Sequence, residues 1–377
     1  MLSFRKVHYL KIISITIGIF LLSSPKVYPT SIIKNSLRVP IGQKAIHKRI
    51  SKEMNRREFI KKIGALGGAI VLTHGSLIDM AVAEPTKEVQ QIISKMSLRE
   101  KLGFLMMPSI DPTFNQQDID YISNYYKLRA YLYDTFYHID YNGAVIERIF
   151  KTQAKFYSQK LPPLIAINME GGWISLIPDA PFPSPMALGA AGSYKLAEVN
   201  GSMIGRTLAQ LGINVNLAPV LDLYSNQENR IVSTRSFGED PEKVAALGAA
   251  FIKGLQSQGI FATAKHFPGI GGAEGDPHIA MQRLDKNLVQ LENEELIPFK
   301  AAIAAGVKII MTGHLLVPQI DPKNPASLSK VFTTDILRHR LGFKGVVMVD
   351  DVRMQAITNK SKGTGLSVEE ATIRAIE

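Results

Sequence analysis

The residues best suited to chemistry lie in the stretch from Lys265 to His278, which reads KHFPGIGGAEGDPH. An apolar run, IFATA, precedes this stretch and stops at a cation, an imidazole and a Pro-Gly break. A Gly-rich loop follows and ends in Asp276, Pro277 and His278. This order is typical of a buried strand that carries polar side chains to a site, with a loop whose glycines are expected to supply flexibility.

Polar side chains also end other apolar segments. They are found in the run from Asn168 to Gly172, at Asp222, at Arg235 in the loop that follows, at His314, and at Asp350 and Asp351. In a barrel of parallel strands, the carboxyl ends of all strands lie on one face, where catalytic residues sit. We therefore expect these side chains to converge with Lys265 and His266.

The elements that would position them alternate along the chain from residue 85. Apolar segments predict strands at 103–109, 142–146, 163–168, 213–223, 260–266, 307–317 and 342–351. Amphipathic patterns predict helices at 194–212, 241–259, 288–306 and 368–377, and the many tyrosines of 121–141 suggest side-chain packing or an aromatic wall. Several strands are apolar throughout, as strands covered on both faces should be.

This alternation predicts an α/β fold, a (β/α)8 TIM-type barrel. We expect this barrel to be truncated before its eighth strand, because only a loop and one helix follow Asp351. A doubly wound open sheet is the alternative, but no Gly-rich phosphate loop follows the first strand.

The net charge of +11 does not indicate a nucleic-acid partner. Residues 1–83 contain 14 of the 44 basic residues and three of the 33 acidic ones, which leaves 30 of each for residues 84–377. The body of the protein is therefore neutral overall, without the basic excess that nucleic-acid binding requires. The absence of cysteine excludes disulfides, thiolate metal ligands and cysteine nucleophiles.

Residues 1–83 are interpreted as a leader. The apolar run at 12–22 is shorter than the roughly 20 residues of a membrane-spanning helix. Arg56 and Arg57, a weakly apolar stretch and the small residues 81–83 resemble a twin-arginine export signal over 54–83, with Met54 as the expected true start. A basic amphipathic helix is the alternative. We expect the export machinery as a partner, membrane contact only during export, and a periplasmic or extracellular location.

Six motifs occur in order over the body of the chain: EGG, APVLD, RSFGED, KHFPG with its later DPH, MTGH and GFKGVVMVDD. Together they resemble the N-terminal catalytic barrel of glycoside hydrolase family 3, and within it the bacterial β-N-acetylhexosaminidase branch. The resemblance covers roughly residues 90–377, so a barrel domain is expected at 84–377. It implies retaining hydrolysis of terminal β-N-acetylhexosaminides, such as cell-wall amino-sugar glycosides, through a covalent glycosyl-enzyme intermediate and without cofactor or metal.

The resemblance also implies roles for single residues. Asp350 would be the nucleophile, with Asp351 as runner-up, and His278 the general acid/base. Asp276 would be the partner of His278, since a carboxylate beside an imidazole fixes its tautomer and raises its proton affinity. A retaining enzyme needs the nucleophile on one face of the sugar and the proton donor near the glycosidic oxygen.

Arg235, Lys265, His266 and Asn168 would bind the substrate, with the cations donating to sugar hydroxyls. The alternative for Arg235 is a salt bridge with Glu239 or Asp240. Asp222 and His314 are interpreted as structural residues that orient their neighbours.

The chain departs from the family pattern Asp-x-Glu-Gly-Gly-Arg at Asn168 and Trp173. Asn168 can accept a hydrogen bond but lacks the charge that strengthens one, and Trp173 either stacks on a sugar face or fills space. A basic residue and a second histidine of the family are replaced by Leu176 and Ile270.

Three other functions compete. A catalytically degenerate barrel that binds glycans is favoured by Asn168, Trp173 and the missing eighth strand. A β-glucosidase-like family member is disfavoured by Asp276 and His278. A metal-dependent hydrolase would use His266, His278 and His314, but the sequence lacks the His-x-His expected at the end of a first strand.

Overall fold

The computed structural model describes residues 15–16, 87–110, 114–133, 149, 151–153, 163–175, 177 and 181–377. The predicted export signal at 54–83, the predicted strand at 142–146 and Leu176 lie outside these ranges. The two-residue strand β1 (Ile15–Thr16) pairs antiparallel with β2 (Met107–Pro108).

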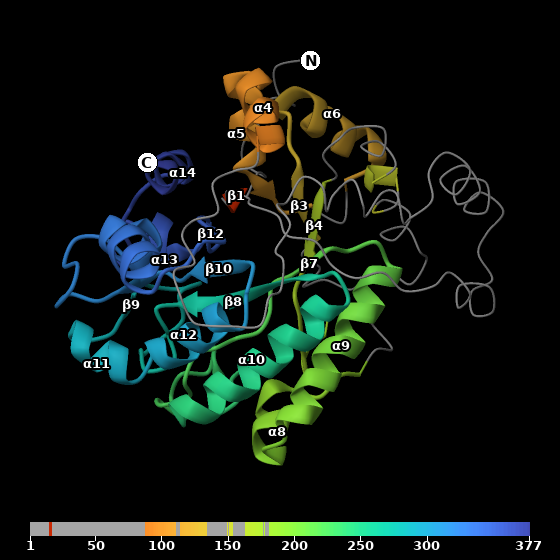
Figure 1. Ribbon diagram of the computed structural model, residues 1–377. Helices are drawn as coiled ribbons and strands as arrows, with labels where there is room; N and C mark the ends of the chain where they lie inside the picture. The colour runs from red at the N-terminus through yellow and green to blue at the C-terminus, as the bar shows by residue number, and fades with distance from the viewer. Residues whose placement is uncertain are drawn as a thin grey trace, which may run out of the picture.

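Six parallel strands form the central sheet (Figure 1). Their order is β12-β10-β8-β7-β4-β3, so strands that follow one another in the chain are neighbours in the sheet. Their bounds are β3 Ala130–Leu132, β4 Leu164–Ile167, β7 Val215–Asn216, β8 Phe261–Phe267, β10 Ile309–Thr312 and β12 Val346–Val349. The strand β2 continues this order through a parallel bridge from Ser109 to Leu132. A doubly wound sheet reverses its order in the middle, whereas this order does not, which confirms the predicted TIM-type barrel class.

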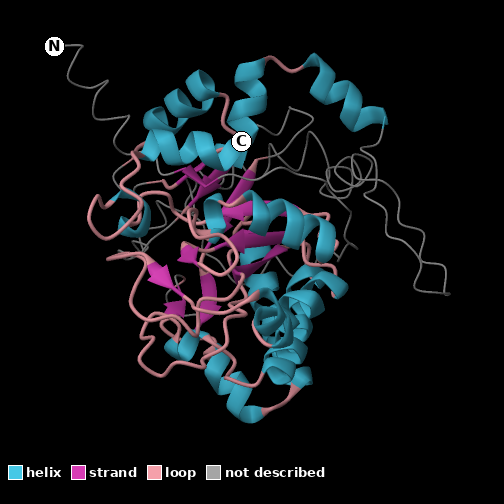
Figure 2. Ribbon diagram, turned by 90° about the vertical axis from the view of Figure 1, so that its left-hand side faces the viewer, coloured by secondary structure: helices cyan, strands magenta, loops and turns pink. Residues whose placement is uncertain are grey.

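Helices surround the sheet (Figure 2). They are α4 Lys87–Lys95, α5 Leu98–Phe104, α6 Gln116–Tyr126, α8 Pro185–Ala191, α9 Tyr194–Gln210, α10 Pro241–Ser257, α11 Leu288–Asn293, α12 Leu296–Ala304, α13 Gln355–Thr358 and α14 Val368–Ile376. A π-helix spans Val331–Arg340, and short 3-10 turns span Ser233–Arg235 and Ala326–Leu328. The helix α10 packs against both α9 and α12. None of the helices in the described ranges is long and apolar enough to cross a membrane.

The strands are buried on both faces. Alternate side chains point to opposite sides of the sheet, so each strand contributes to two separate sets of buried residues. One set packs with the surrounding helices, and includes Ile165, Ile167, Ala262, Ala264 and Ile310. The other set forms a separate cluster, and includes Ala130, Leu132, Ala166, Val215, Ile309, Met311, Val346 and Met348. This double burial explains the continuous apolar runs in the sequence.

The strand β3 was not predicted. Region 121–141 was expected to use its tyrosines for packing, and Tyr121 and Tyr125 do stack one helical turn apart in α6. The chain then turns at Lys127, with φ 59°, and enters β3, where the buried Tyr131 shares a 2.7 Å hydrogen bond with Ser123. This strand precedes the predicted strand at 142–146, which lies outside the described residues. A strand of three residues beside polar neighbours is too short to show a period.

Candidate active site

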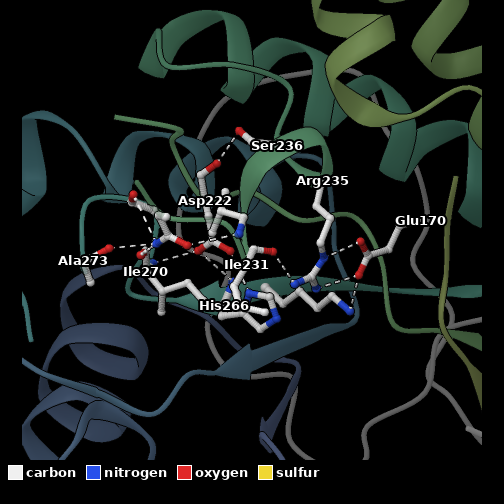
Figure 3. A network of polar contacts seen from close by, with 12 residues as sticks. Glu170, Asp222, Ile231, Arg235, Ser236, His266, Ile270 and Ala273 are labelled. Atoms are coloured by element: carbon white, nitrogen blue, oxygen red, sulfur yellow. Dashed lines mark hydrogen bonds and ion pairs between the residues drawn. The ribbon is translucent and has the colours of Figure 1, made fainter. Parts of the chain in front are cut away.

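A buried ionic cluster forms at the carboxyl end of β4, around Glu170 in strand β5 (Met169–Gly171). The Glu170 side chain is 1% exposed. Arg235 donates to it twice, from Nε to Oε2 and from Nη2 to Oε1, both at 2.8 Å (Figure 3). Lys265 Nζ lies 2.8 Å from Glu170 Oε1 and donates to Asn168 Oδ1 at 2.9 Å. Three of the predicted substrate-binding residues therefore meet, as expected, around an acid that sequence reasoning did not select.

Glu170 had a sequence signal, because it is an acid at the end of a buried strand, in a protein that carries one cation at another strand end and a second in the loop after β7. The structure corrects the alternative partner of Arg235. Its bidentate ion pair is with Glu170, because the loop after β7 folds back over β4, while Asp240 caps α10 by accepting from the N–H groups of Glu242 and Lys243.

The charges of this cluster are coupled. Burial alone would raise the pKa of Glu170, but the charges of Arg235 and Lys265 outweigh it and lower that pKa to about 2. Burial lowers the pKa of Lys265, and the charge of Glu170 opposes this effect. One carboxylate between two cations leaves a net positive charge at the base of the site.

Asp350 lies within electrostatic reach of this charge. It follows β12, is half-buried, and its backbone N–H donates to Thr312 O at 3.1 Å. Burial lowers the pKa values of Arg235 and Lys265. The charge of Glu170 raises both pKa values, and the charge of Asp350 raises them further. Within the described ranges, the one hydrogen bond that its carboxylate accepts comes from the N–H of Asp351, at 2.8 Å.

Asp351 has different surroundings. Its carboxylate forms an ion pair with Arg353, with Nη2 to Oδ2 at 2.7 Å. The geometry therefore favours Asp350 over Asp351 as the carboxylate that serves the site.

Two buried histidines, His266 and His314, are held in place by hydrogen bonds next to the site. Asp222 Oδ2 lies 2.7 Å from His266 Nδ1, and Asp222 Oδ1 accepts from the N–H of Ile270 at 2.8 Å (Figure 3). His314 donates from Nε2 to Asp351 O at 2.9 Å, since a carbonyl only accepts, and its Nδ1 lies 2.7 Å from Ser327 Oγ. Burial lowers the pKa of His314. Both contacts agree with the interpretation of Asp222 and His314 as orienting residues.

The predicted proton-transfer pair is present on the loop after β8. His278 Nδ1 lies 2.7 Å from Asp276 Oδ1, and the side chains are 52% and 28% exposed. Among the described residues, no hydrogen bond or ion pair joins this pair to the Glu170 cluster. The loop is instead tied to the segment after Asp350, because Pro277 O accepts from the N–H of Ala356 at 3.0 Å.

The Gly-rich start of this loop is tightly packed. A Cβ atom on Gly271 would lie 1.6 Å from Leu223 O, so only glycine fits there. The buried Asn229 donates from Nδ2 to Ile270 O at 2.8 Å and to Ala273 O at 2.9 Å. The expected flexibility is thus not the role of this glycine, which permits close packing. Asn229 gave no signal in the sequence.

These groups offer cationic and amide hydrogen-bond donors, carboxylates and an imidazole. Within the part of the chain that the structure describes, no three His, Asp or Glu side chains gather closely enough to hold a metal ion.

Comparison with known proteins places the chain. Residues 97–377 match the family model described as the glycosyl hydrolase family 3 N terminal domain. A beta-hexosaminidase of Chromobacterium violaceum is 36% identical over 235 residues, which are 60% of this chain and 64% of that protein. A beta-hexosaminidase of Nitrosomonas eutropha is 37% identical over 215 residues, which are 55% of this chain and 61% of that protein.

Solved structures agree. A glycoside hydrolase family 3 beta-N-acetylglucosaminidase from Paenibacillus sp. str. FPU-7 matches with a TM-score of 0.68 at 34% identity, over 74% of this chain and 53% of that one. The chain thus spans less than two thirds of the length of these relatives. With its parallel strands in barrel order and the family model matched from residue 97 to 377, this chain belongs to glycoside hydrolase family 3 through its N-terminal domain.

Proposed function

We propose that this protein is a retaining glycoside hydrolase that removes terminal β-linked N-acetylhexosamine from amino-sugar glycosides. The observation that carries the proposal is the buried cluster of Glu170, Arg235 and Lys265, with Asp350 within electrostatic reach of its two cations. The cationic donors can form hydrogen bonds with the hydroxyls of a sugar, and the carboxylate of Asp350 can attack its anomeric carbon. The names of the similar proteins support the class of substrate.

The cluster holds its donors ready for the sugar. Lys265 has three N–H donors, of which Glu170 and Asn168 take two, so one is left for a hydroxyl. Arg235 uses its Nε and Nη2 donors on Glu170 and one on Ile231 O at 3.0 Å, and it retains two more. Because Glu170 fixes both cations, little side-chain entropy is lost on binding.

The first chemical step would form a bond between Asp350 and the anomeric carbon. The bond from that carbon to the glycosidic oxygen breaks, and the leaving oxygen takes a proton from Nε2 of His278. Asp276 holds the Nδ1–H of the same ring and stabilises its cationic form. In the second step His278 takes a proton from water, the water oxygen bonds to the anomeric carbon, and Asp350 is released.

Release of 4-nitrophenol from its N-acetyl-β-D-glucosaminide tests this proposal. The full chain is expected to release it, Asp350→Ala to abolish the release, and Asp351→Ala to retain part of it. Full activity of Asp350→Ala would exclude Asp350 as the nucleophile.

A second candidate is a barrel that binds glycans without cleaving them. It is favoured by Asn168, whose amide oxygen is engaged by Lys265 where the family pattern has a carboxylate. Calorimetric binding of N-acetylglucosamine without any turnover would select it. Turnover of the β-glucoside in preference to the N-acetyl-β-glucosaminide would instead select a β-glucosidase-like activity.

We also propose export through a twin-arginine signal, which the paired arginines and the small residues before Glu84 support. Replacing Arg56 and Arg57 by lysine should move the protein from the periplasmic or extracellular fraction to the cytoplasmic one. An unchanged distribution in cell fractions would contradict the proposal.

A further inference from the structure

We propose that Trp173 is a stacking platform for the sugar on the leaving-group side of the cleaved bond. The preferred substrate would then be a β-linked N-acetylhexosamine oligosaccharide, and glycosides of small alcohols would be poor ones. This inference rests on the proposed function and names the substrate class of the same site.

Trp173 lies at the edge of the site. It occupies the two-residue turn between β5 and β6 (Ile174–Ser175), in which Gly171 and Ile174 are opposite one another. It is three positions after Glu170, so at about 3.6 Å per residue their Cα atoms lie within about 11 Å. The indole is therefore within reach of a sugar next to the one held by the Glu170 cluster.

The backbone that carries Trp173 is held in place. Gly172 has φ 60° at the first position of the turn, as a tight hairpin requires, and its N–H donates to Phe182 O at 2.8 Å. A Cβ atom on Gly171 would lie 2.2 Å from Pro183 O. With Gly171 and Ile174 buried on either side, the hairpin presents one side chain outward from a fixed position.

Trp173 itself is 61% exposed, although tryptophan is highly buried on average. It therefore does not fill space, which was one of the two roles open to it from sequence. Most other exposed large apolar side chains, such as Leu98 and Val289, lie on helices, and Ile279 lies on the loop after β8. A fixed, exposed indole at the carboxyl face of the strands is the kind of surface on which the apolar face of a sugar ring stacks.

The leaving-group side follows from the charges. Arg235, Lys265 and Asp350 serve the sugar that is attacked, because hydroxyls need hydrogen bonds and the anomeric carbon needs the carboxylate. Trp173 offers an apolar face outside this cluster, which suits the neighbouring ring.

Two substrates, one with and one without a second sugar ring, distinguish a stacking role of Trp173 from a role in bond cleavage. For N,N′-diacetylchitobiose, Trp173→Ala should lower kcat/KM about tenfold, mainly through KM, as expected for the loss of one stacking contact. For methyl N-acetyl-β-D-glucosaminide, which has no second ring, the change should stay within about twofold. Trp173→Phe should recover most of the loss, and Tyr125→Ala, an exposed aromatic on α6, should affect neither substrate.

Because Trp173 is the only tryptophan, its fluorescence reports binding directly. In full-length Asp350→Asn, the disaccharide should shift the emission with saturation, and N-acetylglucosamine should shift it little. Equal losses on both substrates, or an unchanged emission while calorimetry shows the disaccharide bound, would overturn the platform. If the wild type hydrolyses neither substrate, the proposed function fails, and the fluorescence titration still decides the role of Trp173.

Discussion

Two regions of the site are built in opposite ways. The Glu170 cluster is buried and held by ion pairs and a hydrogen bond between residues 65 or more positions apart. The Asp276–His278 pair is exposed, and its contact joins residues two positions apart on one loop. The first region depends on the whole fold, whereas the second depends on one loop.

This difference assigns different tasks to the two regions. Buried donors whose positions are fixed by a carboxylate can select a sugar, because they are placed before it arrives. An exposed imidazole can exchange protons with water and with a leaving group. Binding strength and stability should therefore follow the cluster, and proton transfer should follow the loop.

The largest expected effect is that of Glu170→Gln. It leaves Arg235 and Lys265 buried without their counter-charge, which is expected to lower the free energy of unfolding by about 3–5 kcal/mol. Urea unfolding measures the loss, and Asp276→Asn is the matched control, since it removes an exposed carboxylate and should change little. Equal stability of the two variants would remove the distinction between the regions.

Next in size is the effect of His278→Ala on turnover. Loss of a general acid/base is expected to lower kcat about 10²- to 10⁴-fold, with unchanged urea unfolding because the side chain is half exposed. The loss should be smaller for substrates with a good leaving group such as 4-nitrophenol, since these need less protonation. A variant that keeps full kcat on the methyl glycoside would exclude His278 as the proton donor.

Low pH should reduce the contribution of the buried Glu170 cluster to stability. The pKa of Glu170 is about 2 in the folded protein and 4.5 ordinarily, so its stabilising contribution is complete above pH 4.5 and is lost as the pH falls towards 2. The difference in unfolding free energy between wild type and Glu170→Gln should therefore shrink across this window. Urea unfolding of both proteins from pH 6 to pH 2.5 measures it, and a constant difference would contradict the ion pairs.

The smallest effect expected is that of Asn168→Asp. A carboxylate next to Lys265 would accept a stronger, charge-assisted hydrogen bond and give the sugar a charged acceptor. A gain of about fivefold in kcat/KM for the 4-nitrophenyl substrate is expected. A loss of activity would mean that a second carboxylate beside Glu170 disturbs the cluster.

Much of this protein was readable from sequence because the relevant contacts are local. The strand and helix alternation and the pairing of Asp276 with His278 depend on neighbouring residues. The apolar runs also indicated strands with both faces covered. The helical pattern at 288–306 was only partly right, since it is divided into α11 and α12 around Glu294 and Glu295.

Only the tertiary structure decided the rest. Glu170 became the centre of the site because Lys265 reaches it from β8 and Arg235 from the loop after β7, and no local pattern encodes such contacts. The same packing distinguishes Asp350, near those cations, from Asp351, which pairs with Arg353. It also leaves Trp173 exposed on a fixed turn. Local sequence thus determined which groups this protein carries, and long-range packing decided which of them meet.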